Sequence, residues 1–277
     1  MVGVVYQPER PSPRYAVVLG GSGGGVPERM AQRVARAGVT AFGVAYFGAP
    51  GLSPSLVDMP LERLQRAIQL FQSRYGIQRP VGLVGSSKGA ELALCLASRV
   101  GELVGPVIAV SPSSVSWYGL DGRGRPSLRR SSWTWQGSPV PFLPFRQDAA
   151  PRYVPASGLR VDACYQPSRY PPAELDAARL PVERAVGPIL ILAGDDDHMW
   201  PSAPMAAQIA DRMQAHGRHV DSSCVIYQGA GHTFLHFDPK SRPAPVRLRW
   251  DFGGNSAADA EACRDAWERI AAFLQAD

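Results

Sequence analysis

Short apolar runs alternate along this chain with segments whose apolar residues recur every three or four positions. The runs predict buried strands, and bounding glycines and prolines mark the ends of several of them. Continuous apolar strands separated by helices are typical of a mostly parallel sheet that helices cover on both faces. The predicted strands are 15–19, 39–47, 81–85, 107–110, 189–193 and 224–227.

The segments between these strands have the period of amphipathic helices. The clearest one has Leu61, Leu64, Ile68, Phe71 and Tyr75 on one face and ends at Gly76. A glycine directly after the last periodic residue is a common helix stop. The other predicted helices begin near 27, 88, 200 and 257, and the last of them runs to about 275.

Periodicity fails between Ser111 and about Ala185, where large aromatic residues stand among many Pro, Ser and Arg residues. A connection this long inside a compact domain is usually functional. We therefore expect one α/β domain over 1–277, with 111–185 as an inserted lid or substrate-binding excursion.

Composition narrows the classes of function. The net charge is +5, but charged residues make up only 19% of the chain and are scattered, which argues against a nucleic-acid-binding surface. No stretch resembles a signal peptide or a membrane span, so we expect a cytoplasmic protein without a membrane partner. The four cysteines are widely spaced, which favours buried free thiols over disulfides or a zinc site. We expect neither a metal nor another cofactor.

A G-x-S-x-G pattern lies where the strand at 81–85 meets the next helix. Gly85, Ser87 and Gly89 occupy its fixed positions, and Ser86 lacks glycines at the matching offsets. A serine in a strained strand-to-helix turn needs small neighbours because strand and helix pass close together there. The pattern predicts a nucleophile elbow with Ser87 as the nucleophile. The alternative is an ordinary turn with a hydroxyl helix cap.

A serine nucleophile requires a base and an acid that orients the base, and in this architecture they follow in the order Ser, acid, His. Asp197 follows the strand at 189–193, and His232 follows the strand at 224–227. The alternative for Asp197 is an acidic turn or half of a cation site, although no second carboxylate cluster would complete such a site. The other histidines are less suitably placed after a strand. They are His198, His216, His219 and His236.

Catalysis of this kind also needs two N–H donors for the oxyanion of a tetrahedral intermediate. The residue after the nucleophile, Lys88, is predicted to supply one backbone N–H, and Ser22 or Gly23 in the glycine run 20–25 the other. The alternative for the glycine run is a phosphate-binding or dinucleotide loop, but it lacks the Gly-Lys-Ser/Thr ending of a P-loop and a clear ribose-binding acid.

Three segments resemble one known family. The elbow segment 82–98, the segment 180–185 and Gly-Asp-Asp-Asp-His-Met-Trp at 194–200 are similar to the C-terminal α/β-hydrolase domain of acyl-CoA thioesterases and bile acid-CoA:amino acid N-acyltransferases. This superfamily includes dienelactone hydrolase-like enzymes. The resemblance implies an α/β-hydrolase fold and places the family's triad on Ser87, Asp197 and His232.

The chain departs from the family in three places. That family has an N-terminal β-sandwich, for which we find no counterpart here. The excursion after 111 shows no clear match, and the segment after Gly231-His232 differs from the family's aromatic and Pro-rich one. The acyltransferases resemble enzymes with a Cys nucleophile, so Ser87 favours hydrolysis.

These observations favour a serine thioesterase acting on an acyl-CoA or a carrier-bound acyl group. The alternatives are an esterase or lactone hydrolase, an acyltransferase or cyclising enzyme, and a non-catalytic binding module. The excursion supplies candidate substrate contacts in Trp117, Trp133 and Trp135, and Arg129 with its arginine neighbours is a candidate for the phosphates of a coenzyme A or carrier arm.

Overall fold

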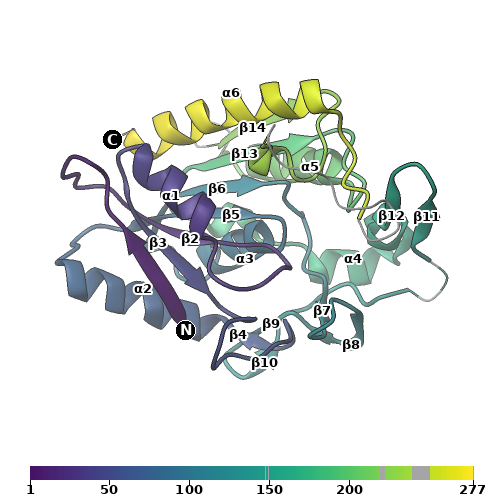
Figure 1. The fold of residues 1–277 in the computed structure, drawn as a ribbon. Coiled ribbons are helices and arrows are strands. Elements are labelled where there is room, and N and C mark those ends of the chain that lie inside the picture. Colours follow the sequence, from purple (N-terminus) through teal and green to yellow (C-terminus); the bar gives the residue numbers. More distant parts are fainter. Residues whose placement is uncertain (147, 149, 219–221, 239–249, 277) are drawn as a thin grey trace.

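The computed structural model describes residues 1–146, 148, 150–218, 222–238 and 250–276. A seven-stranded sheet forms its centre, in the order β1-β3-β2-β5-β6-β13-β14 (Figure 1). In chain order, these strands are β1 (Val2–Tyr6), β2 (Tyr15–Leu19), β3 (Thr40–Ala45), β5 (Val81–Ser86), β6 (Val104–Val110), β13 (Ile189–Gly194) and β14 (Ser222–Tyr227).

All neighbouring pairs in this sheet are parallel except β1 with β3. Strand β1 was not predicted, because it is short and half of its apolar side chains face outward at the sheet edge: Val2 and Val4 are about 40% exposed. The other six strands match predicted ones. The predicted mostly parallel sheet is confirmed.

Helices cover both faces of the sheet. The helices α1 (Glu28–Arg36) and α6 (Ser256–Gln275) pack on one face, where Val34 and Ile270 share a core with Val18 and Val84. The opposite face carries α2 (Leu61–Tyr75), α3 (Lys88–Ala97) and α5 (Ser202–Ala215). Figure 1 shows the two layers, with α1 and α6 above the strands and α2 and α3 below. Gly76 ends α2 in a left-handed conformation at φ 64°, as its position predicts.

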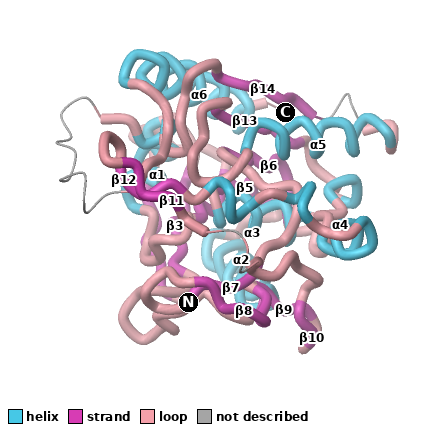
Figure 2. Tube along the Cα trace, turned by 90° about the vertical axis from the view of Figure 1, so that its right-hand side faces the viewer, coloured by secondary structure: helices cyan, strands magenta, loops and turns pink. Residues whose placement is uncertain are grey.

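Short elements make up most of the region after β6. Figures 1 and 2 show them gathered on one side of the central sheet. The periodicity of apolar residues could not predict these elements or how they pack together, because most are only two to seven residues long. They are β7 (Tyr118–Leu120), β8 (Pro126–Ser131), β9 (Trp133–Trp135), β10 (Ser138–Pro139), β11 (Arg152–Val154), β12 (Gly158–Arg160), the 3-10 turn η1 (Asp162–Tyr165) and α4 (Pro172–Ala178); β9 also pairs with β4 (Met59–Pro60).

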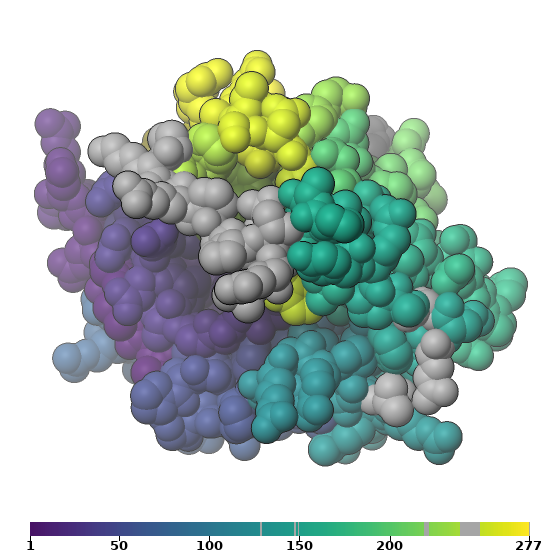
Figure 3. Space-filling view, turned by 45° about the vertical axis from the view of Figure 1, so that its right-hand side comes forward, coloured from purple at the N-terminus to yellow at the C-terminus, as the bar shows by residue number. Residues whose placement is uncertain are grey.

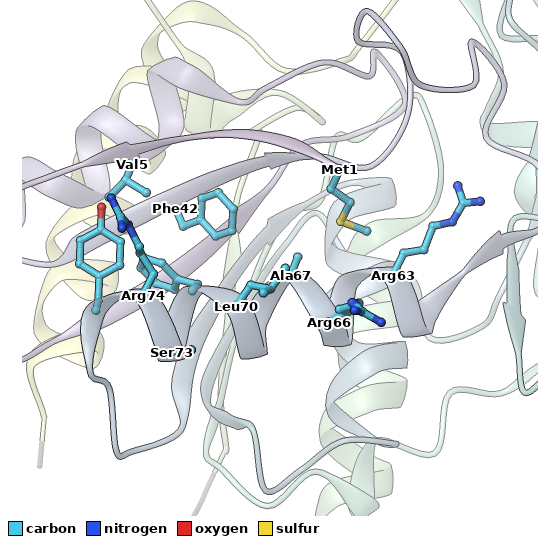
Figure 4. Close-up of a pocket in the computed structure, with 11 residues that line it drawn as sticks. Met1, Val5, Phe42, Arg63, Arg66, Ala67, Leu70, Ser73 and Arg74 are labelled. Carbon is cyan, nitrogen blue, oxygen red and sulfur yellow. The ribbon is translucent and has the colours of Figure 1, made fainter.

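A groove of about 810 Å³ lies between β1 and α2, at the far edge of the sheet (Figure 4). Phe42 and Phe71 line it, with ring centroids 5.0 Å apart, and Arg63, Arg66 and Arg74 line it from α2. None of the predicted site residues lines this groove. Despite its volume, the groove is therefore not the candidate active site.

No helix among the described residues is long and apolar enough to cross a membrane. None of the four cysteines is part of a disulfide, and the predicted burial holds for Cys95, Cys164 and Cys263. Cys224 is exposed because it lies on β14, at the edge of the sheet.

The reactivity of the four thiols should follow their exposure. We expect a disulfide reagent such as Ellman's reagent to modify Cys224 rapidly in the native protein and the other three cysteines only after unfolding. Burial raises the pKa of Cys95 to about 12, so this thiol supplies almost no reactive thiolate near neutral pH. Partial burial also raises the pKa of Cys224, so the expected difference depends on the access of the reagent to this exposed residue. Stopped-flow absorbance measures the fast phase. Cys224→Ser should abolish it, and a fast phase that survives this substitution would contradict the assignment.

Candidate active site

Ser87 lies in a strained turn between β5 and α3. Its φ is 58° and its ψ is −124°, a conformation that L-residues rarely adopt. A Cβ on Gly85 would overlap the carbonyl of Gly89, and a Cβ on Gly89 would overlap the carbonyl of Leu19. Both glycines are therefore required by close backbone approach. This geometry is that of the predicted nucleophile elbow.

The three predicted triad side chains lie within hydrogen-bond distance of one another. His232 Nε2 is 2.9 Å from Ser87 Oγ, and His232 Nδ1 is 2.7 Å from Asp197 Oδ2. Asp197 and His232 are buried, whereas Ser87 is partly exposed. Asp197 follows β13 and His232 follows β14, so parallel strands bring them to the sheet edge at which β5 delivers Ser87.

Backbone and side-chain contacts orient both partners of Ser87. The N–H groups of Met199 and Trp200 donate to Asp197 Oδ1 at 2.8 and 3.2 Å, which leaves Oδ2 for the imidazole. Ser111 Oγ donates to the carbonyl of His232 at 2.8 Å. The carboxylate therefore has a fixed orientation and can hold one tautomer of the imidazole, with the other ring nitrogen toward the hydroxyl.

The glycine run 20–25 packs against Ser87. A Cβ on Gly21 would lie 3.2 Å from Ser87 Cβ, and the next residue, Ser22, lines the cleft above Ser87 together with Lys88. Lys88 is the first residue of α3, so its N–H has no acceptor within the helix. Gly23 lies further out, on the wall of the adjoining pocket. The predicted oxyanion donors thus lie around the cleft.

The cleft continues into a larger pocket. At Ser87 it has a volume of only about 20 Å³, and the adjoining pocket has about 530 Å³. The residues that line both spaces are Ser22, Leu120, Tyr165 and Met199. The larger pocket is mostly aromatic and apolar, with side chains from β7, the segment 145–165 and the segment 250–252. Such a space can receive an apolar group attached to a carbonyl at Ser87.

A family model described as "BAAT / Acyl-CoA thioester hydrolase C terminal" matches residues 59–277. The match covers most of the chain and includes Ser87, Asp197 and His232. The chain belongs to this family. Human acyl-coenzyme A thioesterase 1 is 28% identical over 98% of the chain, and rat acyl-coenzyme A amino acid N-acyltransferase 2 is 28% identical over 99%. The chain spans 62% of the length of each of these relatives.

Solved structures agree on the fold of this BAAT / acyl-CoA thioester hydrolase family member. A dienelactone hydrolase homologue from Klebsiella pneumoniae superposes with a TM-score of 0.56 at 14% identity, covering 98% of this chain and 91% of its own. A monoacylglycerol lipase from Paleococcus ferrophilus gives 0.55 at 15% identity, with 98% of both chains covered. The predicted α/β-hydrolase fold is confirmed.

The structure does not bring the predicted substrate-binding tryptophans to the pocket. Trp117 and Trp133 are fully buried, and their indole N–H groups donate to Ser113 and Glu91 at 2.8 and 2.7 Å. Trp135 is partly buried against the same core. None of the three lines the cleft or the pocket. The indoles of Trp117 and Trp133 belong to the core instead, where each buried N–H has a fixed acceptor.

Arg129 is exposed and lies outside the pocket wall as well. Two of its arginine neighbours form surface ion pairs, Arg125 with Asp121 and Arg130 with Asp58. Arg123 is the member of this group that lines the pocket. Of these arginines, Arg123 is therefore the one whose position suits contact with a group bound in the pocket.

Sequence reasoning missed the residues that close the pocket. Tyr118 and Tyr165 have stacked rings 5.4 Å apart, and Tyr165 also contacts Trp200, which in turn lies against the His232 ring. Phe252 also stacks on His232, with centroids 6.3 Å apart. Among the described residues, no three His, Cys, Asp or Glu side chains form a group that could hold a metal ion.

Proposed function

We propose that this protein is a serine hydrolase that cleaves an acyl thioester, of the acyl-CoA or carrier-bound kind, through an acyl-enzyme intermediate. The observation that carries the proposal is the continuous hydrogen-bonded relay from Ser87 through His232 to Asp197, with distances of 2.9 and 2.7 Å. Membership of the thioester hydrolase family supports the choice of reaction.

In the proposed mechanism, His232 takes the proton of Ser87 as Oγ attacks the thioester carbonyl. Asp197 stabilises the imidazolium that forms. The N–H of Lys88 and that of Ser22 or Gly23 stabilise the oxyanion. When the tetrahedral intermediate collapses, His232 returns the proton to the leaving thiol. Water, deprotonated by His232, then hydrolyses the acyl-enzyme and regenerates Ser87.

The shape of the site supports an apolar acyl group. The carbonyl would occupy the cleft at Ser87, and the acyl chain would extend past Tyr165 and Met199 into the 530 Å³ pocket. Arg123 on the pocket wall suits an anionic part of the substrate, such as a phosphate of the thiol arm. We retain the proposal that the region 111–185 is a substrate-binding excursion, because Tyr118, Phe145 and Tyr165 all come from it. A cytoplasmic location agrees with four free thiols.

Paired substrates test the proposal. For the same acyl group offered as a thioester and as an oxygen ester, we expect a higher kcat/KM for the thioester. An equal or higher kcat/KM for the oxygen ester would instead favour an esterase, an activity to which the α/β-hydrolase fold is equally suited. Adding an amine acceptor and analysing products by mass spectrometry distinguishes hydrolysis from the acyl transfer named for the rat relative.

The passage between cleft and pocket gives a further prediction. Met199→Trp should lower kcat/KM for long-chain acyl thioesters about tenfold or more, because the larger side chain narrows a space that those chains must cross. Met199 also lines the cleft at Ser87, so the acetyl thioester should lose some activity too, but less than the long-chain thioesters. Met199→Leu, which nearly conserves volume, is the matched control. Equal losses for short and long chains in the Trp variant would place the acyl group elsewhere.

A further inference from the structure

A second histidine stands beside the triad acid, and both of its ring nitrogens face carboxylates. His198 Nε2 lies 2.9 Å from Asp196 Oδ1, and His198 Nδ1 lies 2.9 Å from Asp251 Oδ1. Which ring nitrogen donates depends on the tautomer of His198, whereas an ionised carboxylate can only accept a hydrogen bond. We call Asp196, His198 and Asp251 the Asp-His-Asp clasp.

The clasp joins the two loops that carry the partners of Ser87. Asp196 and His198 flank Asp197 in the chain, and Asp251 belongs to the segment 250–255. The carbonyl of Phe252 in this segment accepts from the N–H of His232 at 2.7 Å. Asp197 itself pairs with Gly253 in an antiparallel bridge. One short segment therefore contacts the acid loop and the base loop together.

Further hydrogen bonds fix both carboxylates of the clasp. Asp251 accepts from Ser157 Oγ at 2.5 Å and from the N–H of Gly253 at 3.0 Å, and Asp196 accepts from the N–H of Gly254 at 2.9 Å. Burial would raise the pKa of Asp251, but the hydrogen bonds from Ser157, Gly253 and His198 lower it overall. Asp251 is therefore held as an anion.

The same segment closes one side of the substrate pocket. Trp250 and Phe252 line the pocket, and the N–H of Asp251 donates to the carbonyl of Leu159 on β12. Figure 3 shows this junction at the surface, where the teal β11–β12 hairpin lies beside the yellow segment after residue 249. His198 lines neither the cleft nor the pocket. Its imidazole bonds Asp196 and Asp251, and its carbonyl accepts from the N–H groups of Val161 and Asp162, of which Val161 lines the pocket.

We propose that His198 is a positioning residue: by holding Asp196 and Asp251 together, it keeps the Asp197 loop and the His232 loop in the relative placement that the relay to Ser87 needs. This inference rests on the proposed function. It predicts that loosening the clasp impairs the nucleophile without removing any group of the triad. A displacement of about 1 Å between reacting groups can cost about 100-fold in rate.

The test uses His198→Gln, because a glutamine amide can donate to one carboxylate but presents its oxygen to the other. We expect kcat for the best thioester, and the rate at which a fluorophosphonate labels Ser87, to fall about 10- to 100-fold, with KM changed much less. Asp251→Asn should act in the same direction. His216→Gln is the matched control, because His216 is exposed and bonds only the backbone of its own helix, and it should leave both rates unchanged.

Proton NMR gives a readout that a purely structural role would not move. In the wild type, the His232 proton shared with Asp197 should give a downfield resonance, and in His198→Gln this resonance should broaden or shift while the cooperative unfolding transition is retained. Unchanged rates and an unchanged resonance would overturn the inference. If His198→Gln does not fold, Asp251→Asn decides by the same two measurements. If the fluorophosphonate does not label the wild type, the proposed function fails, and the resonance alone still tests the clasp.

Discussion

Replacing Ser87 with alanine should lower kcat for the thioester substrate by roughly 10,000-fold or more, while substrate binding and folding are retained. The proposed mechanism forms its covalent bond at Ser87 Oγ, and loss of a serine nucleophile abolishes nearly all of a triad's contribution. Alanine removes only the hydroxyl at a site where the side chain is partly exposed and its oxygen contacts His232 at 2.9 Å.

Two measurements and one control variant test this expectation. Mass spectrometry after rapid quenching should detect an acyl adduct on the wild type and none on Ser87→Ala. The adjacent Ser86→Ala is the matched control: Ser86 is a buried strand residue outside the relay, so this variant should still form the adduct. Thermal unfolding of Ser87→Ala should resemble that of the wild type. A Ser87→Ala variant that still turns over substrate would remove Ser87 from the mechanism.

The elements that could be predicted from sequence are those whose signal is local. Strands such as β5 and β13 are buried on both faces and appear as continuous apolar runs, and α2 shows its period and its glycine stop. Strand β1 gave no such signal, since it pairs with one neighbour and exposes Val2 and Val4. Its position depends on pairing with β3, which no local pattern contains.

The placement of the triad was predictable for a related reason. The nucleophile turn needs glycines at fixed offsets, and parallel strands deliver the residues that follow them to one edge of the sheet. Ser87, Asp197 and His232 each follow a strand, so three local patterns sufficed. Whether they catalyse the proposed reaction stays a prediction that the substitutions above test.

The pocket wall could not be predicted, because composition does not separate a core aromatic residue from one that faces a cavity. Trp133 and Tyr165 lie in the same aperiodic region, yet the first is in the core and the second lines the cleft. The difference comes from Glu91, whose buried carboxylate accepts from the Trp133 indole. A glutamate on a helix whose other residues apart from Lys88 are apolar or glycine was the available signal that nearby donors must be buried with it.

The largest effect on the free energy of unfolding is expected when the buried Glu91 carboxylate loses its ion-pair partner. Lys88 and Glu91 form an ion pair at 2.8 Å, and their side chains are 2% and 0% exposed. Lys88 Nζ also donates to Ser132 Oγ at 2.8 Å, and Glu91 accepts further bonds from the backbone N–H of Trp117 and the indole of Trp133. Burial lowers the pKa of Lys88, and the Glu91 carboxylate opposes that shift.

Lys88→Met should lower the free energy of unfolding by about 3–5 kcal/mol, because it leaves the Glu91 carboxylate buried without its cation. Urea unfolding measures the loss. The double variant Lys88→Met/Glu91→Gln should recover part of it, since a neutral amide needs no counter-charge, and the two effects should therefore not add. Arg269→Met, which breaks a half-exposed pair with Asp265 on α6, is the control and should cost less than about 1 kcal/mol. If Lys88→Met costs no more than Arg269→Met, the pair does not act as a buried charge pair.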